Sequence, residues 1–332
     1  MVTSTLTRYF TWRLARMALT VSAVVLVTFG LTRVAYQNPA RMLAPENASE
    51  ETVAAIANSL RLNDPWYLQL WYYVVRGPEI KGTPTGLLNW PPSLGYSYRQ
   101  QRPVTDLILE KIPVTFSLAA GALILWITVS IVLGVYAARR PGSVFDQVSS
   151  ATSYVLLSIP TFVTGVILLF VLYYQLSLAG VKFFPSGGYV ALTESPAEWA
   201  RHLLLPWLTL LLAEVGLFQR VVRASVLEVA NKDYIRTARA KGVGTQGVYF
   251  NHALSAALNP ILTLGAIEFA AILGGAIITE QIFGLDGVGR LAVNAANNGD
   301  APVVIGCTLL GALIFVVSTF VVDLITHARS GK

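Results

Sequence analysis

Asp233-Tyr-Ile-Arg-Thr-Ala-Arg-Ala-Lys-Gly242 is a charged stretch that lies between two segments apolar enough to cross a bilayer. It has helix-forming composition, and Gly242 and Gly244 are expected to break the helix, because glycine accepts the positive φ that ends a helix sharply. A second helix is predicted over Thr245–Leu258, which returns the chain to the bilayer. Attraction to anionic lipid heads requires only positive charge and does not explain an ordered turn. The stretch therefore indicates a pore-forming subunit that is bound and moved by another protein.

The composition places the chain among membrane proteins. Of its 332 residues, 54% are hydrophobic and only 13% are charged, whereas soluble domains usually carry about 25% charged residues. The single cysteine, Cys307, excludes an intrachain disulfide framework. The histidines lie in separate segments, with no spacing typical of a metal site. We therefore expect a membrane protein that binds no metal.

Several apolar segments approach the roughly 20 residues that a helix needs to cross a bilayer. Pro160 interrupts the third segment and Pro260 opens the fifth, since proline removes a backbone donor and favours a kink or a helix start. The sequence thus predicts an all-α polytopic fold with six transmembrane helices, approximately Leu14–Val34, Val114–Ala138, Val148–Leu176, Leu203–Val222, Ile261–Ile282 and Val303–Ile325.

Lysine and arginine fall mainly on one side of these spans. With the N-terminus inside, the inner segments hold many basic residues, and their acidic residues are only Asp146, Glu228 and Asp233. Because positively charged loops stay in the cytoplasm, both termini are expected there. Arg13 and Arg16 precede the first span, but no convincing small-residue cleavage site follows, so this helix is expected to be uncleaved. The net charge of +6 thus reflects topology, and no nucleic-acid partner is expected.

A long segment separates the first two spans, and it is longer than a simple connection between two helices requires. Apolar residues recur at helical spacing from Val53 to Leu60, and Asp64-Pro65 then starts an aromatic-rich helix, Trp66 to Val75. The segment is either a small packed cap or a docking or gating element at a pore mouth. The predicted domains are 1–35 (N-terminus and first transmembrane helix), 36–105 (extracytoplasmic helical insertion) and 106–332 (the membrane core with helices two to six and an inner loop, 224–258).

The inner loop resembles the ATPase-docking loop of ABC importer permeases. The general pattern of that loop is Glu-Ala-Ala, three residues, Gly, nine residues, then Ile-x-Leu-Pro. With its glycine placed on Gly242, Arg236-Thr-Ala238 and His252-Ala-Leu-Ser255 fall on its two ends. Arg236 replaces the usual glutamate, and the terminal proline is absent. The version found here is similar to that of dipeptide and oligopeptide permeases.

Other segments resemble the same family along nearly the whole chain. Leu94-Gly-Tyr-Ser-Tyr98 resembles its signature before the second span, and Arg139-Arg-Pro-Gly-Ser-Val-Phe-Asp146 resembles its first inner loop. Leu157-Ser-Ile-Pro-Thr161 resembles its third span, and Gly287-Val-Gly-Arg290 resembles its last outer loop. Together with the long insertion, the chain looks like the first permease subunit of this family, the DppB/OppB type.

The resemblance implies a type I ABC importer transmembrane-domain fold in a bacterial cytoplasmic membrane. It implies a second homologous permease, two cytosolic ATPase subunits or domains, an extracytoplasmic solute-binding protein and membrane lipid as partners. ATP and Mg would be bound by the ATPases and no cofactor by this chain, which has no phosphate-binding loop motif and is not expected to be an enzyme. The residues that would dock on the ATPase are Asp233, Tyr234, Arg236, Thr237, Ala238, Arg239, Ala240, Lys241, Gly242 and Val243.

Ionisable residues within apolar spans are costly and usually face protein or water. Glu214 and Glu268 are therefore candidates for a substrate path, together with Pro160. The alternative for Glu268 is an interhelical hydrogen bond. Glu280 and Arg290 are candidates for an outer gate.

Two function classes compete. The leading hypothesis is a pore-forming subunit of an ATP-driven importer of di- or oligopeptides, and the alternative is an ion-coupled secondary transporter that uses Glu214 and Glu268. The alternative leaves the ordered inner loop unexplained. An intramembrane enzyme has no supporting motif. The substrate stays open among dipeptides, longer peptides, glutathione, haem and metal chelates.

Overall fold

The computed structural model describes residues 2–330 except 37–39, 42–43, 46 and 91. Within these residues the elements are helices, and the β pairings found there are isolated bridges. The described part of the chain contains six helices long and apolar enough to span a membrane. These spans confirm the predicted all-α polytopic fold; they are Thr11–Ala35, Val104–Arg139, Thr161–Leu178, Pro196–Ala230, Thr245–Ile272 and Ala301–Thr326.

The chain forms two compact units, which are described separately. The first unit comprises Met1–Thr115 and Asp286–Val316, and the second comprises Phe116–Leu285 and Val317–Lys332. Two long helices contribute residues to both units: α5 (Val104–Arg139) and α15 (Ala301–Ser330). Each unit is therefore built from segments that are distant in sequence.

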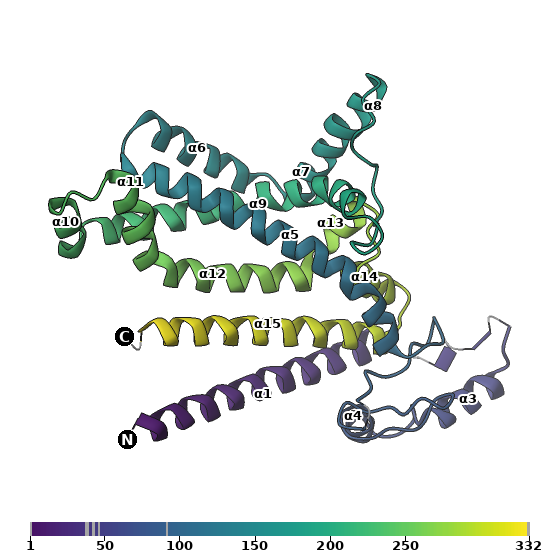
Figure 1. The fold of residues 1–332 in the computed structure, drawn as a ribbon. Coiled ribbons are helices and arrows are strands. Elements are labelled where there is room, and N and C mark those ends of the chain that lie inside the picture. The colour runs from purple at the N-terminus through teal and green to yellow at the C-terminus, as the bar shows by residue number, and fades with distance from the viewer. Residues whose placement is uncertain (1, 37–39, 42–43, 46, 91, 331–332) are drawn as a thin grey trace. The chain divides into compact units, whose positions relative to one another are not determined.

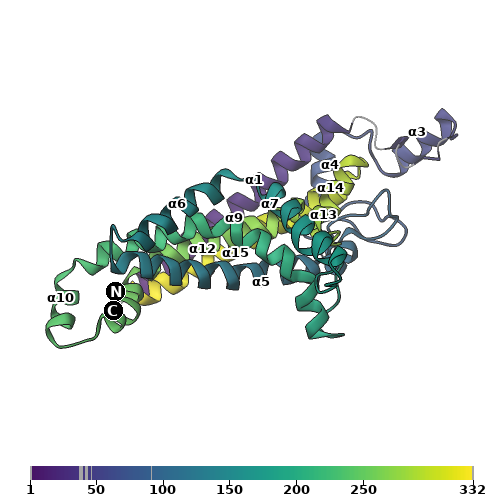
Figure 2. The ribbon, with the colours of Figure 1, turned by 90° about the horizontal axis from the view of Figure 1, so that it is seen from above.

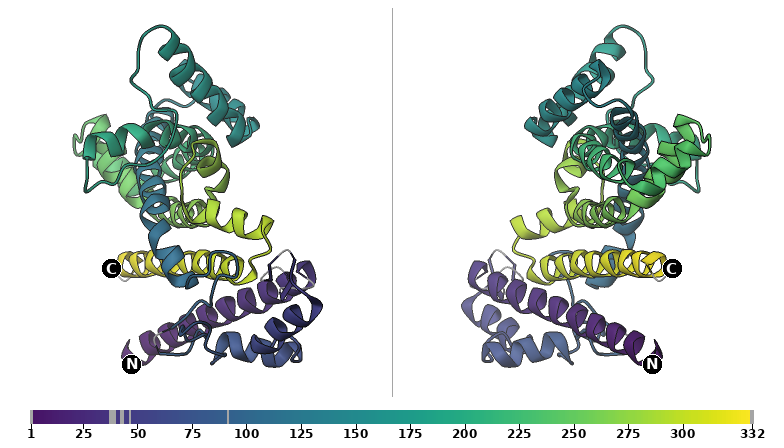
Figure 3. Two further views of the ribbon diagram at one scale, coloured as in Figure 1. Left: turned by 90° about the vertical axis from the view of Figure 1, so that its right-hand side faces the viewer. Right: turned by 90° about the vertical axis from the view of Figure 1, so that its left-hand side faces the viewer.

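In the first unit, short helices of the insertion pack beside the first span (Figure 3). The helix α3 begins at Glu50, directly after Ser49, whose side chain accepts a hydrogen bond from the Thr52 N–H. The Arg33 guanidinium hydrogen-bonds to Gln69 of α4, which joins α4 to the end of α1. The elements, besides α5 and α15, are α1 (Val2–Ala35), α3 (Glu50–Ser59), α4 (Trp66–Val74) and α14 (Val288–Asn297).

The core of the first unit lies where α5, α14 and α15 meet. Leu107 and Val303 are almost completely buried there. The Lys111 ammonium lies 2.5 Å from the Asp286 carboxylate. Asp300 directly precedes α15, and its carboxylate accepts a hydrogen bond from the Ser97 hydroxyl at 2.5 Å. It also accepts hydrogen bonds from the backbone N–H groups of the two residues after Ser97. These contacts hold the loop before α5 against the start of α15.

The second unit is organised around α9 (Pro196–Ala230), which packs against α6, α7 and α12 (Figure 1). On α5, Trp126 is fully buried and meets Phe218 of α9 with ring centroids 4.1 Å apart. The remaining elements are α6 (Val144–Ser158), α7 (Thr161–Leu168), the π-helix η1 (Leu169–Gln175), α8 (Leu176–Leu178), α10 (Asp233–Ala240), α11 (Thr245–Gly247), the π-helix η2 (Val248–Ala253), α12 (Leu254–Gly275) and α13 (Ile277–Ile282).

The predicted third span, Val148–Leu176, is wrong in its first half. The helix α6 ends at Ser158, and Ile159 is extended, with φ −93° and ψ 121°. Proline disfavours the helical conformation of the residue before it, so Pro160 divides the apolar run into two helices. The spanning part is Thr161–Leu178, built from α7, η1 and α8.

The predicted start of the fifth span is also wrong. Pro260 lies inside α12 and does not open it. Membrane helices tolerate an internal proline where the freed backbone groups find other partners, and α12 is preceded by η2 and α11 without a break. The span therefore begins earlier than predicted, at Thr245, and ends at Ile272. Residues 277–282 form the separate short helix α13.

Candidate functional site

The helix α10 lies beyond one end of α9, separated from it only by Asn231 and Lys232 (Figure 2). Its C-terminal end is closed by two backbone hydrogen bonds, from the Gly242 N–H to the Arg239 carbonyl at 3.0 Å and from the Val243 N–H to the Ala238 carbonyl at 3.2 Å. This pair of bonds is the Schellman motif, whose penultimate residue is left-handed. Gly242 has φ +83°, as the sequence predicts.

Gly244 differs from its predicted role. Its φ is −59°, a value that any residue adopts, and it precedes the first turn of α11. The sharp turn after α10 therefore depends on Gly242 alone of the two glycines. The predicted helix over Thr245–Leu258 is present as α11, η2 and the first turn of α12.

The attachment of α10 to the rest of the second unit is narrow. Ile235 is its one buried residue, with 0% of its surface exposed. Arg239 reaches η2, where its guanidinium lies 3.3 Å from the Tyr249 hydroxyl and 5.6 Å from the centre of that ring. Ile235 is absent from the residues that the sequence predicts for docking. Its burial could have been predicted, because Ile235 is the one large aliphatic side chain among the eight residues of α10.

The remaining surface of α10 is exposed and mixed in charge. Tyr234 is 53% exposed, and the side chains of Asp233 and Arg236 form an exposed ion pair at 3.5 Å. Exposed ion pairs contribute little to stability, so these groups are available to a partner without loss to the fold. Thr237, Ala240, Lys241 and Gly242 are exposed as well, and Ala238 and Val243 are half-buried.

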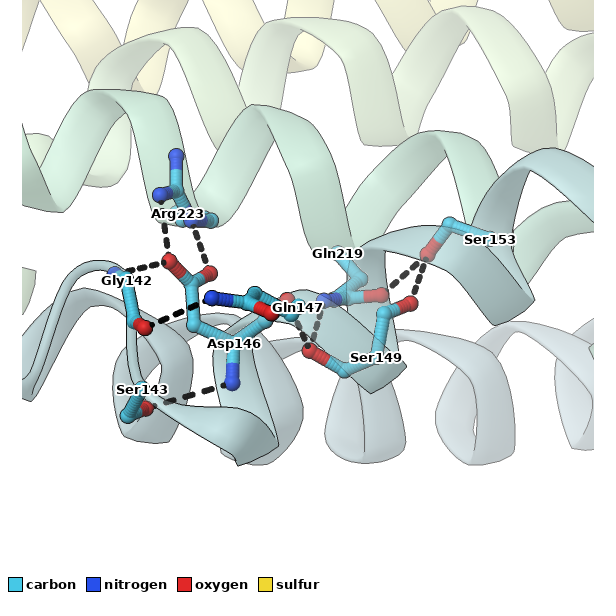
Figure 4. Close-up of polar contacts among 8 residues, drawn as sticks. All are labelled: Gly142, Ser143, Asp146, Gln147, Ser149, Ser153, Gln219 and Arg223. Carbon is cyan, nitrogen blue, oxygen red and sulfur yellow. Dashed lines mark hydrogen bonds and ion pairs between the residues drawn. The ribbon is translucent and has the colours of Figure 1, made fainter.

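An ion pair joins α6 to α9 (Figure 4), about two helical turns before α9 ends at Ala230. The Asp146 carboxylate accepts hydrogen bonds from Arg223 Nε at 2.5 Å and Nη2 at 2.7 Å, and a third from the Gly142 N–H at 2.9 Å. Only 5% of the Asp146 side chain is exposed, against 29% of Arg223. The hydrogen bonds from Arg223 lower the pKa of the Asp146 carboxyl below its usual value, against the opposing effect of burial.

Uncharged hydrogen bonds continue this contact along the two helices. Gln219 is 2% exposed; its side-chain nitrogen donates to the Ser149 hydroxyl at 3.0 Å, and its side-chain oxygen accepts from the Ser153 hydroxyl. One turn further, a Cβ at Gly216 would lie 2.7 Å from the Ser153 carbonyl oxygen. The helices therefore approach so closely that only glycine fits at this point.

Aromatic rings link the start of α6 to the segment that follows α10. Tyr136, near the end of α5, lies 6.4 Å from Phe145 of α6 and 5.7 Å from Phe250 of η2, measured between ring centres. The start of α6 and the helix η2 thus both pack against Tyr136. Sequence reasoning missed Asp146, Gln219 and Arg223 as a group.

The acidic residues predicted for a substrate path come from facing helices of the second unit. Glu214 of α9 and Glu268 of α12 are both half-buried, and the two helices pack against each other. Pro160 is exposed at the break between α6 and α7. A role of these three residues in a substrate path stays a prediction.

The two residues predicted for an outer gate belong to different units. Glu280 is fully buried on α13 of the second unit, and Arg290 is half-buried on α14 of the first. A gate formed by both stays a prediction. Among the described residues, no group of three or more His, Cys, Asp or Glu side chains is placed to hold a metal ion.

Comparison with known proteins places this architecture in one family. Residues 130–329 match the family described as "Binding-protein-dependent transport system inner membrane component", and residues 6–119 match its N-terminal counterpart. A protein of Brucella suis biovar 1, named as a permease of a peptide transport system, is 37% identical over 302 residues, which cover 91% of each chain. The oligopeptide transport system permease protein AppB of Bacillus subtilis is 33% identical over 305 residues, again covering 91% of each. The glutathione transport system permease protein GsiC of Salmonella choleraesuis is 29% identical and covers 96% of each chain.

Proposed function

The chain belongs to the family of binding-protein-dependent transport system inner membrane components, and on that basis we propose that it is the permease subunit of an ATP-driven peptide importer. Members of this family are the membrane components of ABC importers, and the six spans make this chain a multi-pass inner membrane protein. The names of the relatives favour di- or oligopeptides as the substrate. The observation that carries the proposal is α10, an exposed helix with a closed end between two long spans.

In this proposal α10 seats in a groove on a separate cytosolic ATPase. Its exposed face supplies Tyr234 for packing, and Asp233 and Arg236 for new ion pairs. Because only two residues separate α10 from α9, a displacement of α10 is transmitted directly to a helix that crosses the membrane. The chain binds no nucleotide itself; ATP and Mg are bound by two ATPase subunits.

The proposed orientation has both termini and α10 in the cytoplasm. The insertion 36–105 then lies outside, where a solute-binding protein delivers the substrate. A second homologous permease completes the pore. The excess of lysine and arginine on the side of α10 supports this orientation.

Purification of a tagged chain from its native membrane tests the assignment. We expect the ATPases and a second permease to co-purify and the preparation to hydrolyse ATP. Replacing both Tyr234 and Arg236 by alanine should release the ATPases, since both side chains are exposed and their loss leaves the fold intact. A chain that purifies alone and takes up substrate down a proton gradient without ATP would establish the ion-coupled alternative.

The substrate path has its own test. In the proposed pore, Glu268 meets the amino terminus of a peptide, a role suited to an acid held inside the membrane. Uptake of a free dipeptide by Glu268→Gln should then fall by about tenfold, the effect of losing roughly 1.4 kcal/mol, whereas uptake of the N-acetylated dipeptide should change little. Equal losses for both peptides, or none, would assign Glu268 to helix packing.

A further inference from the structure

We infer that Asp146 and Arg223 are positioning residues, which fix the inner end of α9 on α6 so that movement of α10 is transmitted into the membrane. The inference rests on the proposed function, because it concerns the coupling of the docking helix to the pore. It adds a role to residues outside the docking loop, in two helices that do not themselves meet the ATPase in the proposal.

The two helices meet along matching rows of side chains. On α6 the row consists of Asp146, Ser149 and Ser153, and on α9 it consists of Arg223, Gln219 and Gly216. Each row has the spacing i, i+3, i+7 that places residues on one face of a helix. The rows run in opposite directions, with the ion pair at one end, followed by the hydrogen bonds of Gln219 (Figure 4). The close approach at Gly216 lies at the other end.

The ion pair lies at the end of this contact that is nearer to α10. Arg223 precedes the last residue of α9 by seven positions, about two helical turns. A bidentate pair fixes both distance and orientation, which a single hydrogen bond does not. The direction in which α9 ends, and therefore the position at which α10 starts, depends on this pair.

The break after α6 determines which helices can move with α6. Ile159 is extended and Pro160 starts a new helix, so no continuous helical hydrogen bonding joins α6 to α7. By contrast, α6 is tied to α9 at three successive levels of the contact. A displacement of α10 is therefore carried by α9 and α6 as one block, and the break at Ile159-Pro160 keeps it from passing through α6 into α7 along a continuous helix.

The same block is supported beside the docking loop. Tyr136 contacts Phe145 at the start of α6 and Phe250 in η2, and η2 in turn carries Tyr249, the contact of Arg239 in α10. The docking helix thus has two routes into the block, one through α9 and one through η2. Removing the ion pair leaves the contact between Arg239 and η2 in place. We therefore expect α10 to stay attached to the second unit, while the direction in which α9 ends is no longer fixed.

The test uses the complete transporter reconstituted in vesicles, with Asp146→Asn, Arg223→Gln and Arg223→Lys. We expect all three variants to retain the ATPases and to hydrolyse ATP. The number of substrate molecules taken up per ATP should fall about fivefold or more in Asp146→Asn and Arg223→Gln, within the range typical of couplings between sites. Arg223→Lys keeps the charge without the bidentate geometry, and its ratio should lie between those of the wild type and Arg223→Gln.

Glu110→Gln is the matched control, because it removes an exposed ion pair with Arg102 in the first unit. This variant should keep the wild-type ratio. If Asp146→Asn and Arg223→Gln lower uptake and ATP hydrolysis in the same proportion, or leave both unchanged, the pair has only a structural role and the inference is wrong. If the wild-type chain recruits no ATPase, the proposed function fails, and the positioning role fails with it.

Discussion

Gly242 and Gly244 lie two residues apart, but their backbones differ in the side chains that they tolerate. At both positions there is no atom within 4 Å of the place a Cβ would occupy, so neither glycine is required by lack of space. Gly242 has φ +83°, which is unfavourable by about 1–2 kcal/mol for an L-residue with a side chain. Gly244 has φ −59° and carries no such restriction.

This difference predicts three outcomes in an uptake assay of the complete transporter. Gly242→Val should reduce ATP-driven uptake to background, because valine opposes the left-handed conformation and opens the closed end of α10. Gly242→Asn should retain most of the uptake, since asparagine tolerates this conformation, and Gly244→Ala should behave as the wild type. Wild-type uptake by Gly242→Val would contradict the proposed docking role of this turn.

Asp146 predicts a pH dependence of stability with a definite sign. Because its pKa is lowered in the folded protein, its stabilising effect is present above the unfolded carboxyl value of about 3.9 and is lost as the pH falls through the lower folded value. Asp146→Asn should reduce the free energy of unfolding by about 2 kcal/mol at pH 7, less than for a fully buried pair because 29% of Arg223 is exposed.

Thermal unfolding of both proteins between pH 8 and pH 3 measures this effect. The difference in Tm between wild type and Asp146→Asn should be constant down to about pH 4 and decrease only below it. A difference that stays constant down to pH 3, or that grows as the pH falls, would show that the pKa of this carboxyl is not lowered in the folded protein.

Residue identity alone predicts the glycine that closes α10 but not how α10 is anchored to the second unit. The positive φ of Gly242 follows from glycine being the residue that ends helices in this way. The burial of Ile235 and the pairing of Asp146 with Arg223 depend on where α9 and η2 pass. The partners in that pair are separated by 77 positions, a distance at which local sequence patterns give no information.

At the scale of elements, the helices α6 and α7 show why the third span is misjudged from sequence. An apolar run from Val148 to Leu176 has the length of a membrane helix, and a proline inside such a run either kinks it or divides it. The row of Asp146, Ser149 and Ser153 is the sequence signal that α6 is a separate helix packed on protein. That this polar face packs against another helix can be recognised only once the matching row on α9 is known.

Because α6 and α9 approach closely, a single added methyl group is expected to push the two helices apart and lower the stability of the protein. In Gly216→Ala, the new Cβ would lie 2.7 Å from the Ser153 carbonyl oxygen, so α6 must move away from α9. We expect a loss of about 1–3 kcal/mol in stability, as for overpacked cores. Thermal unfolding of the purified chain measures it.

Gly265→Ala is the control, since the nearest atom to its Cβ would be Ile127 Cδ1 at 3.6 Å, an ordinary contact. This substitution, also within a membrane helix, should leave Tm unchanged within about 2 °C. Equal Tm values for Gly216→Ala and the wild type would mean that the two helices are not in close contact.

For the whole molecule, the sequence predicts the membrane-spanning segments better than it predicts which segments pack together. Apolar length identifies all six spans, because the bilayer sets that length directly. The first unit, however, combines Met1–Thr115 with Asp286–Val316. The hydrogen bond between Ser97 and Asp300 joins residues 203 positions apart, and such pairings follow from the fold as a whole.

The short third span has a consequence for the thickness of the surrounding bilayer. Its 18 residues cover about 27 Å at 1.5 Å per residue, less than the roughly 30 Å of a typical hydrocarbon core. The other spans have 25 or more residues and can tilt, so this segment is the first to fall short when lipid chains lengthen. Uptake in vesicles of increasing acyl-chain length should therefore decline beyond a threshold, and lengthening the span by three leucines after Leu176 should move that threshold toward thicker membranes.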